Sequence, residues 1–375
     1  MSASITDDDL ADIRFMSAAI AYARRGLGLT APNPAVGCMI VKHGVIVGRG
    51  ATQPGGRPHA ETVAIADAGE AAQGATLYVT LEPCSHHGVT GPCAQAVITS
   101  GVTRVVSAIE DPDSRVAGRG HAMLREAGIP VRVGVGAEAA MRGNLGHILR
   151  VGQGRPMVTL KLAETADGYA AAGVHDARLM ITGQAANNRV QIMRALHDAV
   201  MVGAGTALGD DPLLTVRLAG LEKRSPLRVI LDTHLRLSLR SRLVATAAEH
   251  PVLVIAGEGA SASARLALEA KGVAVDIAPL GTNGHIDLPS ALSLLAQRGI
   301  TRVFSEGGPL VAAALIEANL VDDVFIFRGA KPFGREGLPA LDAMSRQRLA
   351  DPKRFRAVDP VQLGQDQLVQ YERII

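Results

Sequence analysis

Short predicted strands alternate with short predicted helices along almost the whole chain, and this order restricts the possible folds more than any other feature. An amphipathic helix is expected over 9–25, followed by a β-hairpin over 35–42 and 44–50. Further strands are expected near 76–80, 104–108, 130–135, 157–162, 199–202, 228–231, 252–255, 273–277, 302–304 and 324–327, with helices near 60–68, 93–100, 120–127, 184–196, 262–271, 288–297 and 310–318. Such alternation is typical of a mostly parallel sheet with helices on both faces, so we predict an α/β protein.

The length of the chain predicts more than one domain. Its 375 residues correspond to two or three domains of roughly 150 residues each, and 47% hydrophobic residues suffice for separate cores. The stretch 145–156 contains three glycines, two arginines and a proline, a composition typical of a linker. We therefore expect one domain over 1–148 and a second over 155–375.

The composition disfavours nucleic acids and membranes as partners. Thirty-eight basic and 36 acidic side chains give a formal net charge of +2, aromatic residues make up 3% of the chain, and tryptophan is absent. A broad positive field and aromatic stacking platforms are therefore not expected. Apolar runs are shorter than the ~18 residues that span a bilayer, and the first residues do not resemble a secretory signal. We expect a cytoplasmic protein that acts on a small molecule.

Four residues of the first half predict a catalytic zinc site. His59 and Glu61 stand at the expected start of one helix, Cys84 follows an expected strand, and Cys93 opens another helix. One imidazole and two thiolates supply three ligands and leave a fourth position for water, as in catalytic zinc sites. Zinc lowers the pKa of such a water toward ~7, and Glu61 is placed to carry its proton to a departing amine. This pattern is that of zinc deaminases, which attack an amidine carbon of a pyrimidine or purine.

The same residues also fit other interpretations. Eight residues separate Cys84 from Cys93, whereas most zinc deaminases have two residues between their cysteines. A histidine and a glutamate at this spacing also occur on ordinary surfaces, and cysteines occur in cores, as we expect for Cys38. A purely structural zinc protein would need a fourth ligand, and three are visible. A nucleic-acid base deaminase with an auxiliary domain is disfavoured by the charge and the few aromatic residues.

Longer motifs resemble those of the bifunctional deaminase-reductase family of riboflavin biosynthesis, and the resemblance covers nearly the whole chain. The motifs of its first domain stand here as Pro-Asn-Pro-Ala-Val-Gly at 32–37, His-Ala-Glu at 59–61, and the stretch 80–93 with its long insert between the cysteines. The resemblance implies a three-layer α/β/α domain similar to cytidine deaminases. The roles that it implies are one zinc ion held by His59, Cys84 and Cys93, a catalytic proton shuttle at Glu61, and substrate contacts at Asn33 and His86.

Four positions around the expected substrate pocket depart from the family pattern. They are Ala31, Thr52, Val89 and Gly91, where the family often has His, His, a basic residue and Pro. The metal site is unaffected by these departures. These departures leave the residues that hold the substrate phosphate in this domain unassigned. Arg57 or Arg115 are candidates to replace the family's residues.

A glycine-rich segment at 203–209 follows an expected strand but does not fit a dinucleotide-binding fingerprint. The third glycine of that pattern would fall on Leu208, and Asp-Asp-Pro at 210–212 would interrupt the helix on which a pyrophosphate sits. Glu-Gly-Gly-Pro at 306–309 is a better candidate for a phosphate site, because it follows a strand and opens an apolar helix.

The second half carries further motifs of the same family. They stand here as Leu-Lys-Leu-Ala at 160–163, the string 203–217 with its Asp-Asp-Pro, and Glu-Gly-Gly-Pro at 306–309. The resemblance implies a dihydrofolate-reductase-like α/β domain that binds NADPH. It assigns the cofactor to Ala163, Met180, Gly205, Thr206, Asp210 and Gly308, and the substrate to Lys161, Arg178, Arg194, Leu214, Arg217 and Glu306. Met180 stands where the family often has an aromatic residue.

Together these motifs predict an enzyme of two consecutive steps. The resemblance implies zinc-dependent hydrolytic deamination of 2,5-diamino-6-ribosylamino-4(3H)-pyrimidinone 5′-phosphate. NADPH-dependent reduction of 5-amino-6-(5-phosphoribosylamino)uracil to the ribitylamino compound would follow. An enzyme of the same family that acts on a different pyrimidine is the main alternative. We expect a homo-oligomer, with a pyrimidine ribosyl phosphate as substrate.

Overall fold

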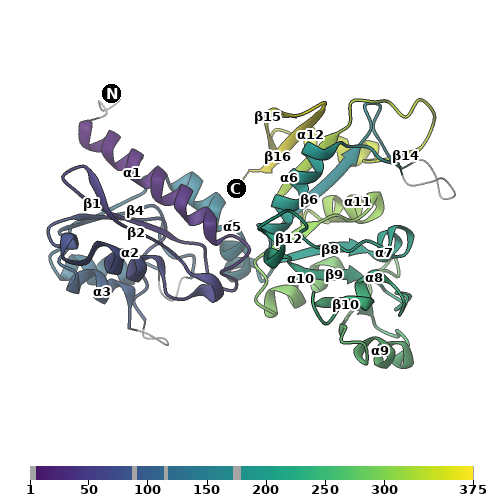
Figure 1. The fold of residues 1–375 in the computed structure, drawn as a ribbon, viewed down its shortest axis with the longest axis horizontal. Coiled ribbons are helices and arrows are strands. Elements are labelled where there is room, and N and C mark those ends of the chain that lie inside the picture. The colour runs from purple at the N-terminus through teal and green to yellow at the C-terminus, as the bar shows by residue number, and fades with distance from the viewer. Residues whose placement is uncertain (1–5, 87–90, 114–116, 172–178, 375) are drawn as a thin grey trace. The chain divides into compact units, whose positions relative to one another are not determined.

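The chain folds into two compact units, Met1–Gly154 and Arg155–Ile375. The computed structural model describes residues 6–86, 91–113, 117–171 and 179–374 (Figure 1). No helix in these ranges is long and apolar enough to cross a membrane.

The first unit is a five-stranded sheet between two layers of helices. Its sheet order is β2-β1-β3-β4-β5, with β1 antiparallel to β2 and β3, and with β3, β4 and β5 parallel. Helices α2, α3 and α4 enclose a core on one face, and α1 and α5 enclose a core on the other. Its elements are α1 Asp7–Ala23, η1 Arg24–Gly26, β1 Gly37–Lys42, β2 Val45–Ala51, η2 Pro54–Gly56, α2 Ala60–Ala68, η3 Gly69–Ala72, β3 Thr76–Val79, α3 Cys93–Thr99, β4 Arg104–Ser107, α4 Arg119–Glu126, β5 Val131–Val133 and α5 Ala137–Gln153.

Helix α2 lies unusually close to strand β2. A Cβ atom at Gly50 would stand 2.0 Å from the carbonyl oxygen of Ala60, so only glycine permits this approach. The contact fixes the first turn of α2 against the sheet, and this turn carries His59 and Glu61.

The second unit is built on a nine-stranded sheet in the order β11-β10-β9-β8-β12-β6-β13-β16-β15. The strands from β11 to β13 are parallel, and β16 and β15 run antiparallel at one edge. Its elements are β6 Met157–Glu164, β7 Tyr169–Ala171, α6 Gln184–Ala195, β8 Ala199–Gly203, α7 Ala204–Asp210, η4 Glu222–Arg224, β9 Leu227–Leu231, α8 Arg242–Ala245, β10 Val252–Gly257, α9 Ala262–Glu269, β11 Ala274–Ala278, α10 Leu288–Gln297, β12 Arg302–Ser305, α11 Pro309–Glu317, β13 Asp323–Arg328, β14 Leu338–Pro339, α12 Ala343–Ala350, β15 Phe355–Leu363 and β16 Asp366–Arg373.

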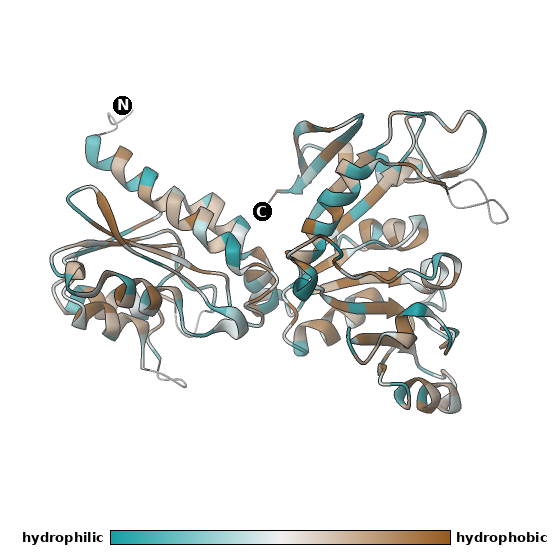
Figure 2. Ribbon diagram, viewed as in Figure 1, coloured by the Kyte–Doolittle hydropathy of each residue, from teal (hydrophilic) through white to brown (hydrophobic). Residues whose placement is uncertain are grey.

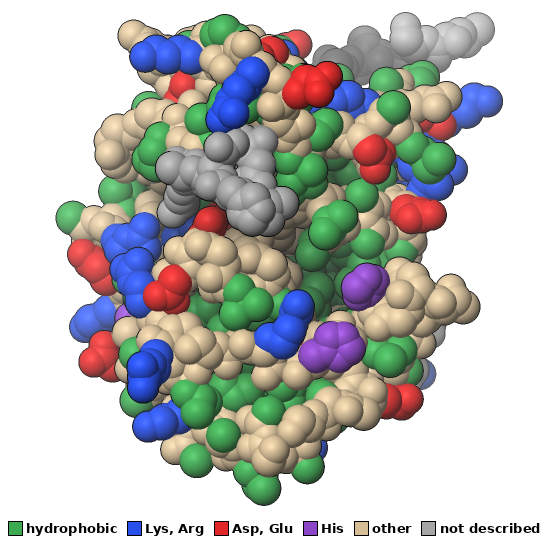
Figure 3. Space-filling view, turned by 90° about the vertical axis from the view of Figure 1, so that its right-hand side faces the viewer, with side chains coloured by type: hydrophobic (Ala, Val, Ile, Leu, Met, Phe, Trp, Pro, Cys, Tyr) green, Lys and Arg blue, Asp and Glu red, His purple; other side chains and the backbone are tan. Residues whose placement is uncertain are grey.

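Two separate cores cover the faces of this sheet. Helices α10, α11 and α12 pack on one face, and α6, α7, α8 and α9 pack on the other. The central strands are hydrophobic on both sides, as buried parallel strands are, whereas the helices carry hydrophilic residues outward (Figure 2). On the face of the second unit seen in Figure 3, Lys and Arg side chains are scattered among acidic and hydrophobic ones.

The structure confirms the predicted α/β alternation and corrects three local expectations. Residues 145–153, expected as a linker, form the second half of α5, because the buried pairs Ala140/Asn144 and Leu145/Leu149 are each four residues apart, the spacing of one helix face. The expected domain end at 148 therefore lies inside a helix. A seven-residue helix, α7, does form before Asp211, although the proline after it ends it there. The hairpin of β15 and β16 was not expected, because β15 is largely exposed and neither strand has an apolar run.

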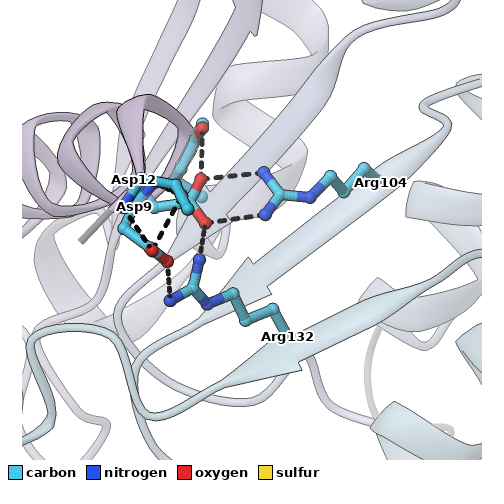
Figure 4. A network of polar contacts seen from close by, with 6 residues as sticks. Asp9, Asp12, Arg104 and Arg132 are labelled. Atoms are coloured by element: carbon cyan, nitrogen blue, oxygen red, sulfur yellow. Dashed lines mark hydrogen bonds and ion pairs between the residues drawn. The ribbon is translucent and has the colours of Figure 1, made fainter. Parts of the chain in front are cut away.

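A buried carboxylate ties α1 to three strands of the first unit. The side chain of Asp12 is 1% exposed and accepts hydrogen bonds from Arg104 at 2.6 and 2.7 Å, from Arg132 at 2.8 Å and from the Tyr78 hydroxyl at 2.9 Å. Asp9 also pairs with Arg132, at 2.6 Å (Figure 4). Burial opposes ionisation of Asp12, but the hydrogen bonds from Arg104 and Tyr78 and the two guanidinium charges lower its pKa.

Replacing Asp12 by Asn tests this network. We expect the free energy of unfolding of the first unit to fall by about 2 kcal/mol at neutral pH, because the arginines are partly hydrated and lose only one partner. The pKa of Asp12 is lower in the folded state, so its stabilisation is present above about pH 4 and is lost as the pH falls through the folded-state value. Denaturant titrations at several pH values measure the difference. The control is Asp8→Asn, which alters an exposed acid one turn earlier in the same helix. Equal effects of the two substitutions would contradict the assignment.

Candidate active sites

Three potential metal ligands meet at the starts of two helices in the first unit. His59 precedes α2 in an extended conformation, and Cys93 is the first residue of α3. The His59 Nδ1 atom lies 3.2 Å from the Cys93 sulfur and 3.7 Å from the Cys84 sulfur. All three ligand atoms lie within 4.8 Å of one another. Ligands at tetrahedral positions around zinc are roughly 3.5 Å apart, so this donor set fits zinc in both chemistry and spacing.

The surroundings of Cys84 favour the thiolate form of its side chain. Its sulfur accepts hydrogen bonds from the Cys93 thiol, from His59, and from the Cys93 backbone N–H at 3.3 Å. These donors lower the pKa of Cys84 to about 4, against the opposing effect of burial. Cys38 behaves differently, because it is fully buried in the apolar core of β1 and its pKa is raised. Cys38 is therefore part of the core, as expected.

Glu61 lies in the first turn of α2, beside the potential ligands. Its side chain is 3% exposed, and burial raises its pKa to about 7. A carboxyl group with such a pKa binds and releases a proton near neutral pH, as general acid-base catalysis requires.

A second buried carboxylate, Glu82, holds the loop that carries Cys84. It accepts four hydrogen bonds from backbone N–H groups, at 2.7 to 3.2 Å, and is 4% exposed. The donors are Asp111, Gly118, Gly120 and His121. Glu82 therefore joins the Cys84 loop to the start of α4. Sequence reasoning missed this role, although Glu82 lies within the motif Thr-Leu-Glu-Pro-Cys.

Asn33 is held close to the residues that lead into α2. Its side-chain amide donates to the carbonyl oxygen of Gly56 at 3.0 Å. Of the other expected contacts in this region, His86 is exposed. Thr52, one of the departures from the family pattern, is buried, and its hydroxyl accepts the Val36 N–H at 3.0 Å. Val89 and Arg115 lie outside the described residues.

The adjacent glycines 55 and 56 allow a test of this arrangement. Both have positive φ angles, of +75° and +85°, but a Cβ atom at Gly56 would stand 2.0 Å from Asn33 Nδ2, whereas one at Gly55 meets nothing within 4 Å. We expect Gly56→Ala to lower the deaminase kcat/KM by about 100-fold, because Asn33 must move by an ångström or more. Gly55→Ala is the matched control and should bear only the backbone strain, about 1 kcal/mol of stability. Similar kinetic losses in both variants would show that strain, and not Asn33, is responsible.

In the second unit, three predicted cationic residues gather around the carboxylate of Glu306. Glu306 forms a two-pronged ion pair with Arg194, at 2.6 and 3.0 Å, and both side chains are about 10% exposed. Arg194 also donates to the Thr215 carbonyl at 2.9 Å. Burial opposes ionisation of Glu306, but the charges of Arg194, Lys161 and Arg217 lower its pKa. Glu306 is therefore a carboxylate within a cationic group of side chains.

Two strand-to-helix turns lie side by side next to this cluster. The Glu306 N–H donates to the Met201 carbonyl at 2.9 Å, which joins the ends of β12 and β8. The Cα of Gly308 faces the Thr206 hydroxyl, since a Cβ there would lie 3.5 Å from it. Gly308 precedes the nine-residue helix α11 and makes no side-chain cap hydrogen bond, so the N–H groups that follow Pro309 in its first turn could bind an anion such as a phosphate of NADPH.

The other predicted site residues of the second unit differ in how exposed they are. Gly205, Asp210 and Met180 are exposed, the last by 75%, and Ala163 is half-buried in β6. The side chain of Leu214 packs in the core, so only its backbone can meet a ligand. Arg178 lies outside the described residues.

Each of the two units matches a known protein family. Residues 10–109 match the cytidine and deoxycytidylate deaminase zinc-binding region, and residues 156–368 match the RibD C-terminal domain. The riboflavin biosynthesis protein RibD of Escherichia coli (strain K12) is 37% identical over 369 residues, which cover 95% of this chain and 97% of that protein. The protein of the same name from Bacillus amyloliquefaciens is 39% identical over 353 residues, covering 94% of each chain.

Solved structures extend this similarity to the fold. Acinetobacter baumannii RibD, form 1, has a TM-score of 0.85 at 35% identity, over 98% of this chain and all of that one. A deaminase/reductase of Thermotoga maritima has a TM-score of 0.82 at 35% identity, over 98% and 100%.

Fold and site together define a two-domain enzyme in which a zinc-dependent deaminase of the cytidine-deaminase type is joined to an NADPH-dependent reductase. The chain belongs to the RibD family, and it is a bifunctional deaminase and reductase of riboflavin biosynthesis. The predicted fold class and both cofactors are thereby confirmed.

Proposed function

We propose that the first unit deaminates 2,5-diamino-6-ribosylamino-4(3H)-pyrimidinone 5′-phosphate and that the second reduces 5-amino-6-(5-phosphoribosylamino)uracil to its ribityl form. The observation that carries this proposal is the pairing of a His-Cys-Cys cluster and a buried Glu61 with a second unit of the RibD type. The similar protein of Thermotoga maritima is a diaminohydroxyphosphoribosylaminopyrimidine deaminase and 5-amino-6-(5-phosphoribosylamino)uracil reductase, which supports the same pair of activities here. We also propose that the first domain ends at Gly154, and not at residue 148 as expected from the sequence.

In the deaminase site, the protein supplies ligands, a proton carrier and substrate contacts. His59, Cys84 and Cys93 would hold zinc, which when bound supplies an acidic water and withdraws electrons from the substrate. Glu61 takes a proton from the nucleophile and returns it to the departing amine, as its raised pKa permits. The amide of Asn33, fixed by Gly56, can donate to and accept from the pyrimidinone edge, and His86 adds a contact at the exposed rim.

In the reductase site, the protein supplies position and charge. NADPH when bound supplies the hydride, and Ala163, Met180, Gly205, Thr206, Asp210 and Gly308 would contact it. The cations Lys161, Arg194 and Arg217, together with the carboxylate of Glu306, would orient the ribosyl phosphate, with Leu214 and Arg178 as further contacts. Glu306 is suited to hold sugar hydroxyls, because it remains ionised among these cations.

We further propose a cytoplasmic location and a homo-oligomer. The location is supported by the chemistry of the metal site, because Cys84 and Cys93 bind zinc only as reduced thiolates. For the oligomer, size-exclusion chromatography with light scattering is the direct test.

An assay of the purified protein with the diaminopyrimidine phosphate tests the function. Ammonia release without NADPH, followed by NADPH consumption once the uracil has formed, is the expected result. A zinc-loaded protein that consumes NADPH with the preformed uracil but releases no ammonia would contradict the proposed first substrate. That result would favour a different pyrimidine, in keeping with the departures at Ala31 and Thr52.

A further inference from the structure

The loop 211–217 of the second unit contains a residue in a strained backbone conformation. Leu214 has a φ of +56°, in the left-handed region that residues other than Gly, Asn and Asp rarely adopt. Its side chain is 3% exposed and packs in the same core as Leu243 and Val244. Such a conformation persists only where the surroundings fix it.

Two buried arginines grip the carbonyl groups on either side of Leu214. Arg194 donates to the carbonyl of Thr215 at 2.9 Å, and Arg228 donates to the carbonyl of Leu213 at 3.2 Å. Arg194 also holds Glu306, so this side of the loop is connected directly to the proposed substrate site. Arg228 belongs to strand β9.

Arg228 is an unusual occupant of a buried strand. It is 0% exposed, and its hydrogen-bond acceptors among the described residues are the Leu213, Leu243, Thr246 and His250 carbonyls and the Thr246 hydroxyl. All of these acceptors are uncharged, and burial lowers the pKa of Arg228 to about 10. A buried cation with uncharged acceptors is costly, and an aliphatic residue would suit a central strand better. The carbonyls that it holds belong to the Leu214 loop and to the segment around α8.

We propose that Arg228 is a positioning residue of the reductase: by holding the Leu213 carbonyl, it fixes the backbone of Leu214 where the pyrimidine substrate binds. This inference rests on the proposed function of the second unit. Arg228 acts from the core and touches neither substrate nor NADPH. Its guanidinium is required because it presents several donors in fixed directions, which the single ammonium of lysine does not.

Full-length Arg228→Met and Arg228→Lys variants test the proposal. We expect Arg228→Met to raise the KM for the uracil substrate about tenfold or more, because small displacements of a binding loop have large effects. The KM for NADPH and the deaminase kcat/KM should stay unchanged. Arg228→Lys should give an intermediate KM. Hydrogen exchange measured by mass spectrometry should increase at 211–217 in both variants.

Leu295→Ala is the control for general destabilisation. Leu295 is fully buried in α10, in the core on the face of the sheet opposite to that in which Leu214 packs. This variant should lower the Tm without changing the KM for the uracil or the exchange at 211–217. The proposal is overturned if the Arg228 variants lower the Tm but leave both quantities at the wild-type value. If the wild-type protein does not reduce the uracil, the proposed function fails, and the exchange at 211–217 still decides the role of Arg228. If Arg228→Met does not fold, Arg228→Lys provides the same comparison.

Discussion

We expect Glu61→Gln to reduce the deaminase kcat/KM by about 10³-fold, to keep one bound zinc per chain, and to leave reductase activity with the preformed uracil unchanged. Glutamine has nearly the shape of glutamate, but its amide cannot take up and release a proton. Because Glu61 is 3% exposed and its pKa is raised to about 7, its loss removes the group best suited to take a proton and return it. Ammonia release, metal content and NADPH consumption are measured on the same preparation.

The control for this variant is Glu70→Gln, which alters an exposed acid just after the same helix. Its activities should equal those of the wild type. Loss of zinc from Glu61→Gln would mean that Glu61 is needed for the metal site rather than for proton transfer. Loss of both activities would contradict two separate sites.

The second large effect is expected for Cys84→Ser. Replacing a residue behind a metal ligand typically weakens metal binding 10- to 100-fold, so replacing the ligand itself should weaken it by more than about 100-fold. Deamination should disappear together with the zinc, and reduction of the uracil should continue. Chelation of the wild-type protein should reproduce the same pattern.

Cys38→Ala is the matched control, because Cys38 is fully buried and lies outside the ligand cluster. We expect it to keep its zinc and to lose about 1 kcal/mol of stability through the removed sulfur. If Cys84→Ser retained zinc and deamination, the three-ligand site would be wrong.

Much of the fold could be predicted from the sequence where the pattern was strong. The central strands of both sheets carry continuous apolar runs, and α10 begins and ends at the residues expected for it, 288 and 297. The prediction failed where tertiary packing determines the structure. Glycines at 146 and 152 disfavour a helix locally, yet α5 extends through both, and its residues Leu145 and Leu149 are buried.

In the candidate sites too, features that depend on residue type could be predicted, and features that depend on tertiary packing could not. The clustering of His59, Cys84 and Cys93 could be predicted, because metal binding requires particular residue types; the role of Glu61 in proton transfer stays a prediction. The contribution of Arg228 could not be predicted, because an arginine in an apolar strand gives no sign of the carbonyls around it. The Glu82 contacts depend on four backbone N–H groups that come together only in the folded chain.

Glu82 also has a consequence for how long the metal stays bound. The Cys84 loop cannot move away from His59 and Cys93 unless Glu82 releases hydrogen bonds to Asp111 and to the start of α4. Opening the site therefore requires a concerted loosening of two segments that are 29 to 38 residues apart in the chain. We expect zinc to exchange slowly with the surrounding solution, so that the enzyme retains its metal through periods of zinc scarcity even where its equilibrium affinity is ordinary.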